Sequence, residues 1–230
     1  MTRIPTDFDY VPFPEPWDSR PWIKAFLAVL AVSVFCIAFI DQPLALYLKA
    51  NLPAHWYPPL TLITEVGQGF WWYALAILWW LYAKRRLAGA TPQAGEKFHR
   101  WAHSAAFMFW AMALSGIVVV TAKVLIGRLR PRYLFEDGTY GFDPFNLSFG
   151  MNCFPSGHSQ AIWSAMIALW FIFPKYRYHA VAVALIVSST RFLLTVHYLG
   201  DVIMGAFVGI AVTAWAKSWF ERKGPGVALD

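Results

Sequence analysis

Charged residues are scarce in this sequence. Asp, Glu, Lys and Arg make up 14% of the 230 residues, whereas soluble globular chains carry about 25%. Hydrophobic residues make up 58%, and the mean hydropathy is +0.46. The 13 Trp and 10 Tyr residues suit the aromatic belts of membrane interfaces. The scarcity of charge argues against a soluble protein, and we expect an all-α, polytopic membrane protein.

Other classes are excluded by what is missing. Two cysteines, Cys36 and Cys153, provide neither a disulfide framework nor a cysteine metal cluster. The N-terminus is acidic at Asp7 and Asp9, where a cleavable signal peptide would be basic. The formal net charge is +6, but no basic face with interleaved polar residues is present, so we expect no nucleic acid partner.

Six apolar segments are each close to the roughly 20 residues that cross a hydrocarbon core. We expect the first to end at Asp41 and Pro43, and the basic run after Ala83 to stop the second. Their predicted bounds are 22–40, 60–83, 101–122, 156–173, 179–196 and 199–219. The predicted organisation is a Pro-rich interfacial segment at 1–21, a six-helix transmembrane domain at 22–220 and a cytoplasmic tail at 221–230.

The basic residues predict the orientation. Most of the 19 Lys and Arg residues fall on one side of the six spans, and that side is expected to be cytoplasmic. Both termini would then face the cytoplasm. The short loops and compact length further suggest a bacterial inner membrane. The basic residues on the other, outer face are Lys49, Lys123, Arg128, Arg130, Arg132 and Arg191.

The first stretch with chemical potential runs from Lys123 to Pro131 and includes Arg130. An interfacial basic anchor is one interpretation. However, this face should be poor in Lys and Arg, and arginine is well suited to bidentate contact with phosphate oxygens.

The second stretch runs from Asn152 to Gln160 and contains Pro155, Ser156, Gly157 and His158. Pro in the first turn and a capping Ser predict a helix start. Such a helix N-terminus favours an anion, and His158 would lie beside it. Taken alone, the pattern is equally compatible with an ordinary capped helix.

The third stretch contains Arg191, His197 and Asp201. His197 and Asp201 are four residues apart and would share one face if helical. A carboxylate that holds one imidazole nitrogen leaves the other free as a nucleophile or base. Arg191 is a charge at the membrane edge and is therefore a functional-site candidate. A structural Arg–Asp pair closing the turn is the alternative.

A metal site formed by His158, His197 and Asp201 is a competing hypothesis. Lys123, Arg130 and Arg191 would surround it, repelling a divalent cation and attracting a phosphate. We therefore expect no metal and no other cofactor.

Taken together, the three stretches resemble the signature motifs of the type 2 phosphatidic acid phosphatase superfamily. The resemblance covers Lys123-x6-Arg130-Pro131, Pro155-Ser156-Gly157-His158 and Arg191-x5-His197-x3-Asp201. The motifs occur in the family's order, and the six-helix plan of its membrane branch spans about residues 22–220. One departure is Thr190, where the family usually has Ser.

The resemblance implies roles for these residues. His197 would attack phosphorus to form a phosphohistidine, oriented by Asp201. His158 would protonate the leaving group and then activate water. Five residues would bind the phosphoryl oxygens at the outer membrane face: Lys123, Arg130, Ser156, Gly157 and Arg191. Arg128 and Arg132 lie outside the motifs and are expected to contact the headgroup at most.

The expected partner is a phosphorylated membrane lipid within the bilayer. Candidates known for the family include phosphatidic acid, phosphatidylglycerophosphate, undecaprenyl pyrophosphate and the 1-phosphate of lipid A. The loop 132–154 is predicted to cover the headgroup, and Glu65 and Gln68 could approach it. A lipid phosphotransferase using the same phosphohistidine remains an alternative, as does, more distantly, a transporter or channel.

Overall fold

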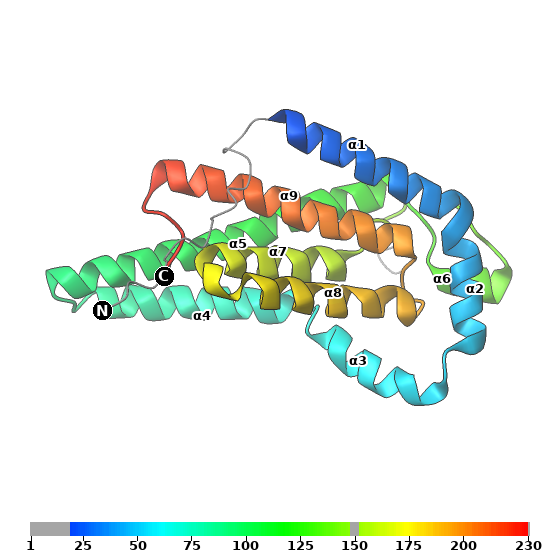
Figure 1. Cartoon of the computed structure of the whole chain (residues 1–230), viewed down its shortest axis with the longest axis horizontal. Coiled ribbons are helices and arrows are strands. Elements are labelled where there is room, and N and C mark those ends of the chain that lie inside the picture. Colours follow the sequence, from blue (N-terminus) through cyan, green and yellow to red (C-terminus); the bar gives the residue numbers. More distant parts are fainter. Residues whose placement is uncertain (1–18, 148–151, 230) are drawn as a thin grey trace, which may run out of the picture.

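The computed structural model describes residues 19–147 and 152–229. Within these ranges the regular secondary structure is helical apart from two isolated β-bridges, and turns and loops connect the helices. Figure 1 shows the arrangement of the helices. The helices are α1 (Ser19–Phe35), α2 (Asp41–Asn51), α3 (Tyr57–Glu65), α4 (Gly69–Leu87), α5 (Pro92–Ile126), α6 (Pro131–Asp137), α7 (Gly157–Ile172), α8 (Arg177–Leu193) and α9 (Leu199–Lys223). The prediction for segment 1–21 lies almost entirely outside the described residues.

Helix α7 forms the centre of the bundle. It packs against α5, α8 and α9, while α4 covers the outer side of α5. Its sequence is apolar on every side, and 12 of its 16 residues are buried. A helix that is hydrophobic all round belongs in the interior, so the sequence of α7 explains its position.

Glycines let α9 approach α7 closely. A Cβ on Gly205 would overlap the carbonyl oxygen of Ser156, and one on Gly209 would lie 2.7 Å from the carbonyl oxygen of Gln160. Because glycine has no side chain at these positions, the two backbones come into direct contact. This contact fixes the start of α9 against the start of α7.

The prediction that the first span ends at Asp41 and Pro43 is wrong. Helix α1 passes through a π-helical turn, Cys36–Ile40, directly into α2, and Figure 1 shows the axis bending there. Pro43 lacks the N–H that a regular helix needs. A π-bulge is a known way to accommodate such an interruption.

The second and third predicted spans also differ from the structure. Residues 66–68 interrupt the second, separating α3 from α4, and α4 continues through the basic run to Leu87. The third is longer than predicted at both ends, because α5 includes polar residues from Pro92 onward and extends to Ile126. The last three predicted spans agree with α7, α8 and α9 to within a few residues.

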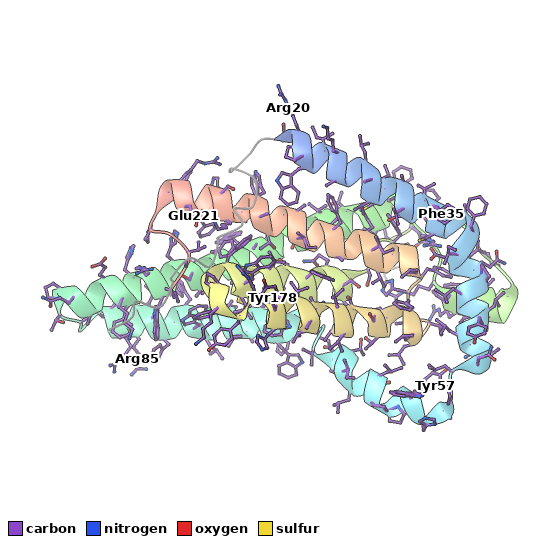
Figure 2. The ribbon with its side chains drawn as sticks, in the orientation of Figure 1. Arg20, Phe35, Tyr57, Arg85, Tyr178 and Glu221 are labelled. Atoms are coloured by element: carbon purple, nitrogen blue, oxygen red, sulfur yellow. The ribbon has the colours of Figure 1, made fainter. Side chains whose placement is uncertain are left out.

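Three helical segments of the described chain are long and apolar enough to cross a membrane: Ser19–Asn51, Pro92–Ile126 and Leu199–Lys223. Neighbouring helices such as α3, α4 and α8 also expose large apolar side chains. Figure 2 shows such side chains pointing away from the bundle. Arg85 and Glu221 lie toward one end of the long axis, whereas Phe35 and Tyr57 lie toward the other (Figure 2).

Candidate active site

The three motif stretches meet at one end of the bundle. They lie at the C-terminal ends of α5 and α8 and the N-terminal ends of α7 and α9, on the right-hand side of Figure 1. Two backbone hydrogen bonds connect them. Ser156 N of the second stretch donates to Asp201 O of the third over 2.9 Å, and Cys153 N of the second donates to Arg128 O of the first over 2.7 Å. The predicted convergence is therefore seen in the structure.

His197 and Asp201 are in contact, but they do not share a helix face. His197 precedes α9, which begins at Leu199. Its Nδ1 lies 3.5 Å from Asp201 Oδ2. Asp201 reaches back toward the helix start because it belongs to a capping box, accepting a hydrogen bond from Tyr198 N over 2.9 Å.

Cys153 joins this pair, which the sequence analysis did not foresee. Its Sγ donates to Asp201 Oδ2 over 2.7 Å and lies 3.2 Å from His197 Nδ1. These contacts occupy the Nδ1 side of the imidazole and leave Nε2 as the nitrogen available for a substrate. Proximity to the Pro155–His158 motif was the only sequence signal for Cys153.

Arg128 is not a headgroup ligand, contrary to expectation. It is 1% exposed. Its terminal nitrogens contact Asp201 Oδ1 at 2.5 Å and Asp41 Oδ2 at 2.9 Å. A buried arginine must be paired with charge to offset its lost hydration, and two carboxylates fill this need here. Asp41 was not predicted to lie near the site.

The second motif forms the start of α7. Ser156 is the N-cap, and its hydroxyl accepts a hydrogen bond from Ser159 N over 3.4 Å. Pro155 lies before this cap and not in the first helical turn, because α7 begins at Gly157. His158 is half-buried and packs beside Gly67, where an added Cβ would lie 3.4 Å from the imidazole Cδ2.

The cationic side chains surround this helix start. His158 is within electrostatic range of Lys123, Arg130 and Arg191. Lys123 Nζ donates to the carbonyls of Asn152 and Cys153, at 3.0 and 3.2 Å. An ammonium group has three protons, so one donor remains.

Two guanidinium groups present buried donors. Arg191 donates from one terminal nitrogen to Thr64 Oγ1 over 2.8 Å. Its Nε and that of Arg130 are buried without a hydrogen-bond partner among the described residues. Buried polar groups are normally hydrogen-bonded, and phosphate oxygens are the acceptors that guanidinium groups suit best. This pair of arginines therefore favours an anionic ligand.

His197 lies outside the helices, and burial lowers the pKa of its imidazole, opposed by the neighbouring Asp201 carboxylate. The side chain is 3% exposed. A lowered pKa keeps the ring uncharged near neutral pH, and only an uncharged imidazole has a free lone pair.

The metal hypothesis can be compared with the donors present. The hypothesis named His158, His197 and Asp201. Among the described residues, the potential ligand atoms that lie within 4.8 Å of one another belong to Cys153, His197 and Asp201 instead. Arg128 already occupies the other oxygen of Asp201, and Lys123 and Arg191 act electrostatically on His197. These cations disfavour a divalent metal ion at this position.

The remaining residues singled out in the sequence lie around the site. Thr190 is buried and donates to Val187 O over 2.6 Å. Glu65 is exposed, accepts a hydrogen bond from Gln68, and is within electrostatic range of Arg191. Arg132 is exposed and donates to the hydroxyl of Tyr133 over 2.7 Å. Part of the predicted covering loop, 148–151, falls outside the described residues.

A helical membrane bundle with these side chains at one end defines an integral membrane phosphatase. The family model of the PAP2 (type 2 phosphatidic acid phosphatase) superfamily matches residues 104–225, more than half of the chain. The chain belongs to this superfamily, and it is a bacterial membrane lipid phosphatase, a phosphoric ester hydrolase.

Two curated relatives support this classification. The chain is 29% identical over 187 residues to the lipid A 1-phosphatase of Rhizobium etli, covering 80% of this chain and 78% of the relative. It is 27% identical over 197 residues to the lipid A 1-phosphatase of Rhizobium johnstonii, covering 84% and 77%.

A solved structure shares the fold. It is a transmembrane PAP2-type phosphatidylglycerolphosphate phosphatase from Bacillus subtilis, with a TM-score of 0.64. The match covers 88% of this chain and 97% of that one, at 17% sequence identity. At this identity the likeness bears on the fold alone.

Proposed function

We propose that this protein hydrolyses the phosphate of a membrane lipid through a phosphohistidine on His197. The observation that carries the proposal is the contact of His197 Nδ1 with Asp201 and Cys153, which leaves Nε2 free. Arg191 acts electrostatically on the same ring, and the buried Nε atoms of Arg130 and Arg191 have no hydrogen-bond partner within the described chain. Nucleophile and anion-binding donors thus occur together at one end of the bundle.

The proposed reaction has two steps. His197 Nε2 forms a bond to phosphorus while the bond to the leaving oxygen breaks, and His158 gives that oxygen a proton. His158 then takes a proton from water as the water attacks phosphorus and breaks the P–N bond. Lys123, Arg130, Ser156, Gly157 and Arg191 hold the phosphoryl oxygens and stabilise their charge in the transition state.

Lipid A 1-phosphate is the substrate that we propose first, because both curated relatives carry the name of that activity. The test measures phosphate release by the purified protein in detergent with EDTA present. The panel contains lipid A, phosphatidylglycerophosphate, phosphatidic acid and undecaprenyl pyrophosphate. We expect the fastest release from lipid A, and a faster rate on another lipid would reassign the substrate.

His197→Ala is the control for the mechanism. We expect it to lose nearly all release, and retention of more than a few per cent of the parent rate would overturn the nucleophile. Vanadate, a mimic of five-coordinate phosphorus, should inhibit the parent, whereas strong inhibition by EDTA would restore the metal hypothesis. Release only after addition of an acceptor lipid would indicate a phosphotransferase.

We also propose six membrane crossings, formed by α1–α2, α3–α4, α5, α7, α8 and α9, with both termini in the cytoplasm and the site facing the exterior of the inner membrane. The basic residues at the α4–α5 end support this orientation. Two cysteine substitutions test it with a membrane-impermeant thiol reagent. In spheroplasts Gly138→Cys should react and Gly89→Cys should not; the reverse pattern would invert the topology.

A further inference from the structure

A buried chain of charges extends from His197 to the N-terminal part of the protein. Asp201 contacts Arg128, and Arg128 contacts Asp41 at the start of α2. Asp41 also accepts a hydrogen bond from Gly200 N over 3.0 Å, across 159 residues of sequence. The exposed fractions of Asp41, Arg128 and Asp201 are 1%, 1% and 0%. A charged group this deep needs a specific reason, since its desolvation is costly.

Arg128 is fully engaged by the protein. Besides the two carboxylates, it donates to the hydroxyl of Tyr140 over 2.7 Å, and its guanidinium lies 4.2 Å from the ring centroid of Tyr198. Tyr140 in turn donates to Ile37 O over 2.6 Å. Both terminal nitrogens therefore have partners within the described chain, and Arg128 is not placed to bind a phosphate.

The two oxygens of Asp201 are divided between separate partners. Oδ1 takes the bond from Arg128, while Oδ2 faces Cys153, Tyr198 N and His197 Nδ1. A bond to Oδ1 prevents rotation of the carboxylate, so Oδ2 stays directed at the imidazole. Asp41 holds Arg128 in turn, and its bond to Gly200 ties α2 to the first turn of α9.

The net charge of Asp41, Arg128 and Asp201 suits a step in which His197 becomes positively charged. Asp41, Arg128 and Asp201 together carry a net charge of −1 on the side of His197 that faces Asp201, and the cations Lys123 and Arg191 also act electrostatically on the ring. When Nε2 of His197 bonds to phosphorus and Nδ1 keeps its proton, the ring becomes positive, and the whole group becomes neutral. Without the Asp41 carboxylate the same step would leave Arg128, Asp201 and the ring with a net charge of +1, to which Lys123 and Arg191 would add. Such a charge is unfavourable where screening by water is weak.

We propose that Asp41 and Arg128 are positioning residues for phosphoryl transfer to His197. They fix the Asp201 carboxylate and supply the negative charge that offsets the imidazolium. The inference rests on the proposed function, in which His197 is the nucleophile and Asp201 its partner.

The experiment compares Asp41→Asn, Arg128→Gln and Arg128→Lys with the parent in single-turnover hydrolysis. Enzyme is in excess, so the rate constant does not depend on the fraction of active protein. The inhibition constant of inorganic phosphate and the melting temperature are measured alongside. We expect Asp41→Asn and Arg128→Gln to lower the rate constant at least tenfold, with the phosphate inhibition constant within about twofold of the parent. The rate constant of Arg128→Lys should lie between those of the parent and Arg128→Gln. An ammonium group keeps the positive charge but cannot contact both carboxylates as the planar guanidinium does.

Two controls separate positioning from a general loss of structure. Glu221→Gln removes a carboxylate paired with Lys217, and Arg100→Gln removes an arginine that holds Ala228 O, both at the opposite end of the bundle. These variants should keep the parent rate constant, even where the melting temperature falls. If Asp41→Asn does not fold, Asp41→Glu gives the same readout, because it displaces the carboxylate by one methylene group.

The outcomes distinguish this inference from the proposed function. Parent rate constants in folded Asp41 and Arg128 variants, with His197→Ala inactive, would overturn the positioning role alone. An active His197→Ala would instead overturn the proposed function. A change in the phosphate inhibition constant as large as the change in rate would show that the variants damage anion binding and would also contradict the proposal.

Discussion

The central and peripheral helices of this protein differ sharply in burial. Helix α7 buries most of its residues, whereas only Ser33 is buried in α1. Helices α7 and α9 meet backbone to backbone at Gly205 and Gly209. By contrast, α1 packs mainly on α9, through side chains such as Phe26 against Phe207, and α3 packs mainly on α8.

The central helices carry the proposed site residues, whereas the peripheral helices contact and hold some of them in place. All proposed catalytic and phosphate-binding residues lie in α5, α7, α8, α9 and the loops next to them, and the superfamily match begins at residue 104. The N-terminal helices contribute side chains that hold arginines. Asp41 of α2 contacts Arg128, and Thr64 of α3 accepts from Arg191. The peripheral helices thus adjust a site that the central helices build.

The largest loss of activity should come from removing Arg130 or Arg191, the arginines in or next to the central helices. Arg130→Ala or Arg191→Ala removes a guanidinium that, in the proposed mechanism, stabilises phosphoryl charge in the transition state. We expect the turnover rate to fall on the order of 100-fold or more. Steady-state hydrolysis of the preferred lipid measures it, and parent activity in either variant would contradict the phosphate-binding role.

The contact between α7 and α9 can be broken directly. Gly205→Ala places a Cβ against the Ser156 carbonyl oxygen, and overpacking of this kind costs about 1–3 kcal/mol. We expect a lower melting temperature and reduced activity, because the helix starts carrying Ser156 and Asp201 are forced apart. Gly89→Ala is the matched control, since an added Cβ there has no neighbour within 4 Å. Equal melting temperatures would show that the backbone contact is not tight.

The smallest loss of activity should come from a substitution in the peripheral helix α3. Thr64→Val keeps the shape of the side chain and removes the acceptor for Arg191. A typical hydrogen bond contributes about 1 kcal/mol, so we expect activity to fall roughly fivefold. A loss as large as that of Arg191→Ala would mean that α3 determines the position of Arg191 and does not merely support it.

The central part of the fold was accessible from sequence. Apolar runs near the length of a membrane crossing predicted α7, α8 and α9. The motifs predicted that the three stretches converge, and backbone hydrogen bonds join them in the structure. The peripheral part was not. The apolar run Cys36–Ile40 does not reveal its π-helical turn, and the polar residues after it indicated a helix end where the helix in fact continues. The break at 66–68 had a local signal in Glu65, Gly67 and Gln68, but the apolar residues on both sides led to one continuous predicted span.

The contacts of Asp41, Arg128 and Cys153 were not predicted from the sequence for one shared reason. Asp41 and Arg128 are far apart in sequence and meet only in the folded chain. Cys153 lies in the loop before α7, and nothing in its surroundings predicts a contact with a carboxylate in α9. Long-range pairing of buried polar groups depends on how helices pack, and hydropathy carries no information on that packing.

The close contact of α7 with α9 has a consequence for how a lipid reaches the site. His158 is carried by α7, and His197 is tied to the start of α9 through Asp201. Since these two helices touch through their backbones, they behave as one rigid body, and the spacing between the two imidazoles is set by folding and not by ligand entry. An acyl chain cannot enter through this seam. The turn between α3 and α4 also borders His158, since a Cβ on Gly67 would lie 3.4 Å from its imidazole Cδ2.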